Sequence, residues 1–280
     1  MLNKSANVLL DNAVIYSKMW TNHLRDLKQA LGLFRAKKWK LKRKKCKFGQ
    51  QSVELLGHVV SKDGFCQDSK KREKMILLID VTSRAELKSW VHFVQYYQKF
   101  VPNFSDVAQL LFMMTSKKVP FVWDMTAKEA MDKLKVALAR DVILAFSDVN
   151  KLYKVYADAS AIAMGFVLVQ KGRPVCFGSK VFNSAQRNYS AGDQEILVVV
   201  TVLEKFWMYL KGQRVIVWTD HKPLVNYLSQ NGCEMLGCKV RVWQKLNRFN
   251  VEICYVAGKD NIVADVLSRN PIKLSVSVCV

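Results

Sequence analysis

The order of apolar segments after residue 150 restricts the fold of this chain more than any other feature. Alternating or continuous apolar runs predict strands at 152–157, 164–170, 174–180, 214–219 and 251–256. Helical spacing predicts helices at 189–210, 223–229, 239–248 and 262–268. Three strands, a helix, a strand, helices, a strand and a helix form an α/β order, which predicts a mixed sheet flanked by helices.

The first 150 residues have a different pattern, in which short strands give way to helices. Residues 7–17 are apolar and β-prone, and residues 20–36 have helical spacing. Residues 52–56 and 58–61 predict two short strands, and residues 70–140 are helical in pattern. The region before the α/β segment is therefore expected to be mixed at first and mostly helical afterwards.

These changes of pattern divide the chain into parts. We predict one domain over 1–70, a second over 71–150 and an α/β domain over 151–271, followed by a tail over 272–280. The sequence shows no internal repeat and no low-complexity linker between the parts.

The charge of the chain indicates a polyanionic partner. Lys and Arg outnumber Asp and Glu by 44 to 23, for a net charge of +21. Basic side chains gain affinity for nucleic acid by releasing counterions from phosphates. Ribosomal, chromatin and membrane-surface proteins share this composition, so charge alone does not choose among them.

Neither a membrane segment nor a disulfide framework is indicated. The longest nearly apolar run, residues 196–203, is too short to cross a bilayer, and no signal pattern opens the chain. The seven cysteines are scattered, which is typical of reduced thiols. We expect an intracellular protein, cytoplasmic or nuclear, with no membrane partner.

A basic segment, residues 37–47, contains eight Lys or Arg among its eleven residues. The predicted nucleic-acid contacts are Lys37, Lys38, Trp39, Lys40, Lys42, Arg43, Lys44 and Lys45. The alternative is a solvated face between a helix and a hairpin. Arg241, at helical spacing with two further basic residues, either contacts nucleic acid or lies on a plain exposed face. Tyr189 and Trp207 are expected in the core.

Four carboxylates in the α/β part stand out by position. Asp158 and Asp220 end apolar strands, Glu195 flanks the apolar stripe of a helix, and Asp265 opens the last helix. Singly, each is explained by a helix cap, a strand-end turn or a surface charge. Together they suit two Mg²⁺ or Mn²⁺ ions, which need several converging carboxylates and assist phosphodiester cleavage.

Specific motifs surround these carboxylates. They are Tyr156-Ala-Asp158-Ala-Ser160, Asn188-Tyr-Ser190 with Glu195, Thr219-Asp220-His221-Lys222-Pro223-Leu224, and Ala264-Asp265-Val-Leu267-Ser268-Arg269. In order and spacing they resemble the RNase H domain of gypsy-type LTR retrotransposon Pol polyproteins. The resemblance implies an RNase H-like mixed sheet, with the four carboxylates as its catalytic and metal-binding quartet. Cellular enzymes also place a histidine near the last aspartate, and none lies there in this chain.

The resemblance continues upstream, so that residues 9–271 are covered. Leu55-Leu-Gly57-His58-Val-Val-Ser61 resembles the end of a reverse transcriptase palm, which implies that Gly57 and His58 contact the primer strand. The segment from Tyr96 to Trp123 resembles the thumb and connection. The family's Tyr-x-Asp-Asp motif aligns with residues 9–12, where Asp11 is followed by Asn12. We therefore expect a truncated, polymerase-inactive palm.

Two functions follow as hypotheses. The first is an RNase H that cuts RNA in RNA–DNA hybrids with two bound ions, leaving 5′-phosphate and 3′-hydroxyl ends. The second is a non-catalytic remnant that binds nucleic acid. A nonfunctional relic is a third outcome, which predicts poor solubility. Other Pol polyprotein segments are candidate partners.

Overall fold

The fold is seen in a computed structural model, which describes residues 5–9, 12–77, 81–159, 162–222, 225 and 244–257. The side chains of Leu9 and Asp158 lie outside this description. The chain forms two compact units, Met1–Gln50 and Gln51–Val280.

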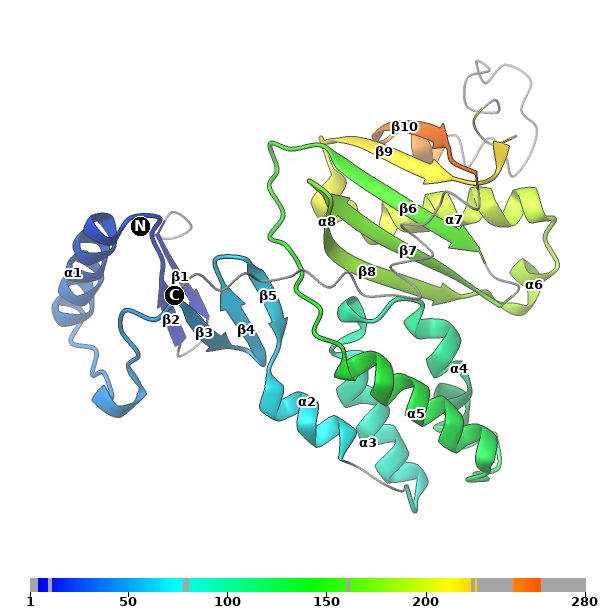
Figure 1. The fold of residues 1–280 in the computed structure, drawn as a ribbon, viewed down its shortest axis with the longest axis horizontal. Helices are drawn as coiled ribbons and strands as arrows, with labels where there is room; N and C mark the ends of the chain where they lie inside the picture. Colours follow the sequence, from blue (N-terminus) through cyan, green and yellow to red (C-terminus); the bar gives the residue numbers. More distant parts are fainter. Residues whose placement is uncertain are drawn as a thin grey trace. The chain divides into compact units, whose positions relative to one another are not determined.

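The first unit contains a hairpin and a long helix (Figure 1). Strands β1 (Ala6–Leu9) and β2 (Asn12–Ile15) pair antiparallel, in agreement with the β-prone pattern. Helix α1 spans Trp20–Ala36, the range that the helical spacing predicts. A short 3₁₀ helix, η1 (Arg43–Lys45), lies in the basic segment.

The second unit begins with a small sheet and a group of helices. Its sheet has the order β3-β4-β5 with antiparallel neighbours. The elements up to residue 139 are β3 (Ser52–Leu55), β4 (His58–Ser61), β5 (Gly64–Gln67), α2 (Ser69–Ile76), α3 (Arg84–Gln95), η2 (Gln98–Phe100), α4 (Phe104–Met114) and α5 (Met125–Ala139). The predicted helical region is thus several short helices.

The larger sheet has five strands in the order β10-β9-β6-β7-β8. Its elements are β6 (Tyr153–Ala159), β7 (Ala163–Gln170), β8 (Arg173–Val181), α6 (Ser184–Arg187), α7 (Ala191–Lys205), α8 (Trp207–Leu210), β9 (Arg214–Thr219) and β10 (Asn250–Tyr255). Strands β6, β7 and β8 are antiparallel neighbours, whereas β9 runs parallel to both β6 and β10. The predicted α/β class with a mixed sheet is confirmed.

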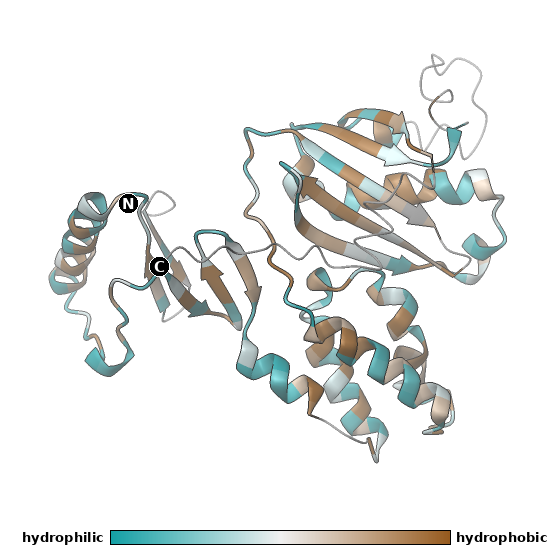
Figure 2. Ribbon diagram, viewed as in Figure 1, coloured by the Kyte–Doolittle hydropathy of each residue, from teal (hydrophilic) through white to brown (hydrophobic). Residues whose placement is uncertain are grey.

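The strands of the five-stranded sheet are rich in hydrophobic residues (Figure 2), and these residues belong to two cores. Helix α7 packs Val198, Val199 and Val202 against one face, in a core that includes Val155 and Val217. The other face, at β7 and β8, joins the core of helices α3, α4 and α5. Because side chains alternate along a strand, successive residues of β7 enter different cores.

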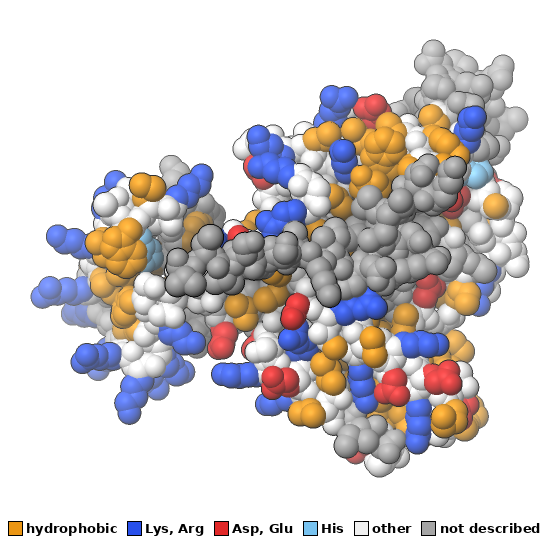
Figure 3. Space-filling view, viewed as in Figure 1, with side chains coloured by type: hydrophobic (Ala, Val, Ile, Leu, Met, Phe, Trp, Pro, Cys, Tyr) orange, Lys and Arg blue, Asp and Glu red, His pale blue; other side chains and the backbone are white. Residues whose placement is uncertain are grey.

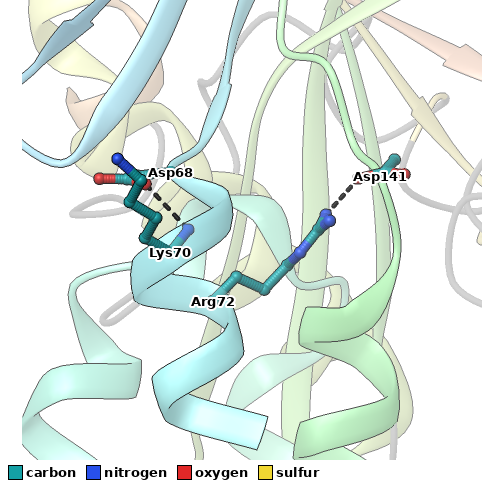
Figure 4. Close-up of polar contacts among 4 residues, drawn as sticks. All are labelled: Asp68, Lys70, Arg72 and Asp141. Carbon is teal, nitrogen blue, oxygen red and sulfur yellow. Dashed lines mark hydrogen bonds and ion pairs between the residues drawn. The ribbon is translucent and has the colours of Figure 1, made fainter.

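Residues 140–152, which we term the connector, lead from α5 to β6 and are held along their length. Arg72 of α2 pairs with Asp141, beside the Asp68 cap of α2 (Figure 4). Phe65 and Leu144 exchange two backbone hydrogen bonds of 2.9 Å. The side chain of Gln170 donates to the carbonyl of Asp148 and accepts from its N–H. The connector therefore ties the small sheet to the large one.

Three expectations differ from the structure. The predicted helix over 189–210 is interrupted at Phe206, so that α7 and α8 are separate. Tyr189, expected in the core, is 48% exposed, because it lies in the turn before α7. The predicted boundary between residues 70 and 71 falls inside α2, since Asp68 caps that helix. The domain assignment as a whole stays a prediction.

Within the ranges that the structure describes, no helix combines the length and the apolar character needed to span a membrane. The predicted helices over 223–229 and 262–268 lie almost entirely or entirely outside those ranges.

Candidate active site and nucleic-acid contacts

The ends of strands β6 and β9 bring two of the predicted carboxylate positions to one edge of the sheet. The two strands are parallel, and Tyr156 is paired with Trp218. Asp158 follows Tyr156 by two residues, and Asp220 follows Trp218 by two. Parallel strands end at the same edge, so the backbone places Asp158 and Asp220 at matching positions.

Glu195 reaches this edge from helix α7. Its side chain is buried, with 9% of the residue exposed, and it accepts a hydrogen bond of 3.3 Å from the Thr219 hydroxyl. Thr219 is the last residue of β9 and precedes Asp220, which is exposed. The carboxylate of Glu195 therefore lies beside the end of the strand that carries Asp220.

Helix α7 is fixed at both ends, which holds Glu195 in place. At its start the Ser190 hydroxyl accepts from the Asp193 N–H at 3.2 Å and donates to the Asp193 carboxylate at 2.7 Å. At its other end the Lys205 ammonium donates to the Ser179 carbonyl of β8 at 3.0 Å. Burial lowers the pKa of Lys205 from its ordinary value.

Strand β7 passes close to an upstream loop next to Asp158. Gly165 is the partner of Asp158 in the β6–β7 register. A Cβ atom at Gly165 would lie 1.8 Å from Oδ1 of Asn103, so any larger residue would require the Asn103 side chain to move. Asn103 itself has φ +47 and ends the turn before α4. The loop before α4 thus packs directly against the strand beside β6.

Of the predicted quartet, one member is described only in part and another is not described at all. The backbone of Asp158 is in β6, its side chain lies outside the description, and Asp265 lies outside it altogether. Among the described residues, no three His, Cys, Asp or Glu side chains are grouped closely enough to hold a metal ion. The two carboxylates that are described, Glu195 and Asp220, supply the hard oxygen donors that Mg²⁺ and Mn²⁺ prefer.

The turn between β3 and β4, at Leu56 and Gly57, is held by hydrogen bonds from two tyrosine hydroxyls. Both residues have positive φ, +47 and +77. The Tyr97 hydroxyl donates to the Gly57 carbonyl at 2.8 Å, and the Tyr96 hydroxyl donates to the Leu56 carbonyl. Leu56 remains 51% exposed at the tip of this turn.

His58, which the sequence assigns to primer contact, lies beneath that turn. Only 8% of it is exposed, and its ring packs against those of Phe65, Tyr96, Tyr97 and Phe100. The structure therefore places the His58 ring in the core, which leaves the turn itself as the exposed part of this motif. The primer-contact assignment stays a prediction.

The buried His58 ring makes stability depend on pH. Burial, reinforced by the nearby Lys99 charge, lowers the pKa of His58 from 6.5 to about 4. The unfolded state binds a proton more readily, so stability falls as pH drops from about 6.5 toward 4. The loss from this group is about 2 kcal/mol by pH 5. We expect His58→Phe to remove that loss in denaturant unfolding measured across this range.

An exposed histidine provides the control for this measurement. His92 of α3 is exposed, and His92→Phe is expected to leave the pH dependence of unfolding as in the wild type. An equal loss of stability between pH 6.5 and 5 in wild type and His58→Phe would contradict the assignment to His58.

The basic segment is exposed at every residue except Cys46, which is half-buried. All of its Lys and Arg side chains are exposed, and Figure 3 shows Lys and Arg side chains projecting from the part of the chain around α1. Trp39, predicted to stack on a base, stacks on Phe34 with 5.6 Å between ring centroids and remains 58% exposed. Arg241 lies outside the described residues, as does Asp11.

The site contains features that the sequence patterns did not reveal. The pattern of apolar residues does not reveal the contact of the Thr219 hydroxyl with Glu195, because a threonine at the end of a strand is common. The contact of the His221 ring with Gly192 is likewise invisible in sequence: a Cβ at Gly192 would lie 3.3 Å from the His221 Cε1 atom. A glycine in the first turn of a helix is the one available hint.

Comparison with known proteins agrees with this geometry. Residues 123–217 match the family model described as the RNase H-like domain found in reverse transcriptase. Foamy viral protease-reverse transcriptase has the same fold. Its structure in complex with double-stranded DNA aligns with a TM-score of 0.80 and 18% sequence identity, and the alignment covers 90% of this chain and 46% of the foamy viral chain. The foamy viral structure in complex with an RNA/DNA hybrid aligns with a TM-score of 0.78, and the alignment covers 90% of this chain and 35% of the foamy viral chain. The α/β part of the chain is thus an RNase H-like domain of the reverse transcriptase type.

Sequence relatives extend this to nearly the whole chain. The Drosophila melanogaster retrovirus-related Pol polyprotein from transposon 297 is 33% identical over 272 residues, which is 96% of this chain and 25% of the relative. The Pol polyprotein from the Drosophila melanogaster transposon gypsy is 30% identical, and the alignment covers 96% of this chain and 27% of the relative. The Schizosaccharomyces pombe transposon Tf2-7 polyprotein is 31% identical, and the alignment covers 93% of this chain and 20% of the relative. The chain is thus similar to one segment of retrotransposon Pol polyproteins, and it spans between a fifth and about a quarter of the length of these relatives.

Proposed function

We propose that the chain is a retroelement-derived ribonuclease H that cleaves RNA in RNA–DNA hybrids. The observation that carries this proposal is the position of Glu195, which is buried and accepts a hydrogen bond from Thr219, the last residue of β9 and the residue before Asp220. Asp158 stands at the matching end of β6. Carboxylate oxygens at the end of a sheet are hard donors, which are the ligands that Mg²⁺ and Mn²⁺ prefer.

The proposed ligands are Asp158, Glu195, Asp220 and Asp265. Bound Mg²⁺ or Mn²⁺ would supply an activated water and would stabilise charge at the scissile phosphate. Attack on phosphorus breaks the bond to the 3′ oxygen, leaving a 3′-hydroxyl on one fragment and a 5′-phosphate on the other. Recognition through phosphates and 2′-hydroxyls would make the activity specific for hybrid geometry rather than for sequence.

The test is cleavage of labelled RNA in an RNA–DNA hybrid by the full chain. We expect cuts that require Mg²⁺ or Mn²⁺, stop with a chelator and are absent on double-stranded DNA of the same sequence. Tight hybrid binding without any cleavage would support the second candidate, a non-catalytic nucleic-acid-binding remnant. The observation that favours this alternative is the exposed basic segment.

Charge removal tests binding by the basic segment. Changing Lys42, Arg43, Lys44 and Lys45 to Gln is expected to weaken duplex binding by at least about tenfold. It should also reduce the slope of log affinity against log salt by about 3.6 if all four residues contact phosphates, since each lost phosphate contact removes about 0.9. The measurement is fluorescence anisotropy at several salt concentrations.

A variant of equal charge provides the control for the basic segment. Changing the exposed Lys74, Lys117, Lys118 and Lys133 to Gln removes the same four charges elsewhere. If both quadruple variants lose affinity equally, binding follows net charge, and the segment is not a specific contact.

We also propose that the chain has no DNA polymerase activity by itself. Asn12 of β2 stands where the family motif has its second aspartate, and an amide brings no negative charge to a metal ion. Primer extension on a homopolymer template is expected to give no incorporation, and clear incorporation would refute this. We further propose that the chain acts with other Pol segments inside the cell.

A further inference from the structure

Thr219 connects three elements at the candidate active site. It is completely buried at the end of β9. Its hydroxyl donates to the Glu195 carboxylate at 3.3 Å and accepts from the His221 N–H at 3.2 Å. Its carbonyl accepts from the Val256 N–H at 2.9 Å, just after β10. One side chain thus links the helix that carries Glu195 to the turn that carries Asp220.

The His221 ring strengthens this link from the other side. It packs over the first turn of α7 at Gly192, where a Cβ atom would be 3.3 Å from its Cε1 and 3.5 Å from its Nε2. Its Nδ1 atom is buried and has no hydrogen-bond partner among the described residues. The main chain of His221, which directs the Thr219 hydroxyl, is therefore held against α7 by its own ring.

The donor type matters for a carboxylate that must bind a cation. A Lys or Arg partner would compensate the charge of Glu195 and compete with a metal ion. A threonine hydroxyl is neutral, so it fixes the orientation of the carboxylate without compensating its charge. Because the His221 N–H occupies an acceptor site of Thr219 Oγ1, the hydroxyl proton is directed toward Glu195.

We propose that Thr219 is a positioning residue: its hydroxyl, oriented by the His221 main chain, sets the Glu195 carboxylate for metal binding. This inference rests on the proposed function, because it assigns Glu195 to the metal site. Residues that orient metal ligands typically change metal affinity or activity by about 10- to 100-fold when they are replaced.

The experiment compares Thr219→Val, which keeps the β-branched shape without the hydroxyl, with Thr219→Ser, which keeps the hydroxyl. Thr219→Ala is the second hydroxyl-free variant, should valine disturb folding. Thr201→Val, at a buried threonine of helix α7, is the control. Mn²⁺ affinity is measured by calorimetry on the full chain, and hybrid cleavage is measured against Mg²⁺ concentration.

We expect Thr219→Val to weaken Mn²⁺ binding by about 10- to 100-fold and to shift the Mg²⁺ dependence of cleavage upward by a similar factor. Thr219→Ser should recover most of both, and Thr201→Val should behave as the wild type. Wild-type Mn²⁺ affinity in Thr219→Val overturns the inference, as does an equal loss in Thr219→Ser, which would indicate packing rather than the hydroxyl.

The two readouts separate this inference from the proposed function. If the wild type binds Mn²⁺ and Thr219→Val binds it more weakly, but neither cleaves, the ribonuclease assignment fails and the positioning role stands. If the wild type cleaves the hybrid and Thr219→Val binds Mn²⁺ and cleaves as the wild type does, the ribonuclease assignment stands and the positioning role fails. If the wild type does not bind Mn²⁺, both fail.

Discussion

Glu195→Gln is expected to reduce metal-dependent hybrid cleavage by at least about a hundredfold. The change keeps the shape of the side chain and its ability to accept from Thr219, but it removes the negative charge at the edge of the sheet. A metal ion contributes several kcal/mol of charge stabilisation to phosphodiester cleavage, and each 1.4 kcal/mol is about tenfold in rate. The measurement is the single-turnover rate on a labelled hybrid.

Glu204→Gln is the matched control for this prediction. It is the same substitution on the same helix, at an exposed residue that pairs with Lys245 at 2.8 Å. We expect its cleavage rate to remain near that of the wild type, because an exposed ion pair contributes little and lies away from the strand ends. Equal rates in Glu195→Gln and the wild type would remove Glu195 from the site.

Gly64→Ala is expected to destabilise the second unit by about 3 kcal/mol or more. Gly64 has φ +135, which a residue with a Cβ rarely adopts. An added Cβ would also lie 2.1 Å from the carbonyl oxygen of Leu144. That oxygen accepts the Phe65 N–H, so the substitution must break the contact between β5 and the connector. Denaturant unfolding measures the loss.

Gly172→Ala separates the two causes. Gly172 has φ +73, and an added Cβ would meet no atom within 4 Å. Its substitution should therefore cost only the backbone strain, about 1–2 kcal/mol. A loss in Gly64→Ala no larger than that in Gly172→Ala would mean that the connector yields readily, contrary to the packing described.

Much of the fold follows from apolar spacing. The predicted ranges for α1 and β9 coincide with those observed, because each is a single amphipathic or alternating run with clear ends. Strand β5 was not predicted, since its four residues carry too little pattern. The break at Phe206 was also missed: its side chain is buried like its helical neighbours, so periodicity continues through it.

The candidate site was predicted in part. Strand ends and an apolar stripe single out Asp220 and Glu195 because charge beside buried residues is unusual. The hydrogen bond of Thr219 depends on how α7 crosses β9, and no local pattern encodes that crossing. The burial of His58 likewise depends on Tyr96, Tyr97 and Phe100, which lie about 40 residues further along the chain.

Titration of the wild-type chain with Mn²⁺, followed by electron paramagnetic resonance, tests the central claim most directly. If the four carboxylates meet at the edge of the sheet, two ions bind per chain with saturable affinity. Asp158→Asn, Glu195→Gln, Asp220→Asn and Asp265→Asn should each weaken that binding strongly. Wild-type protein without saturable Mn²⁺ binding, or four variants that bind as the wild type does, would contradict the account.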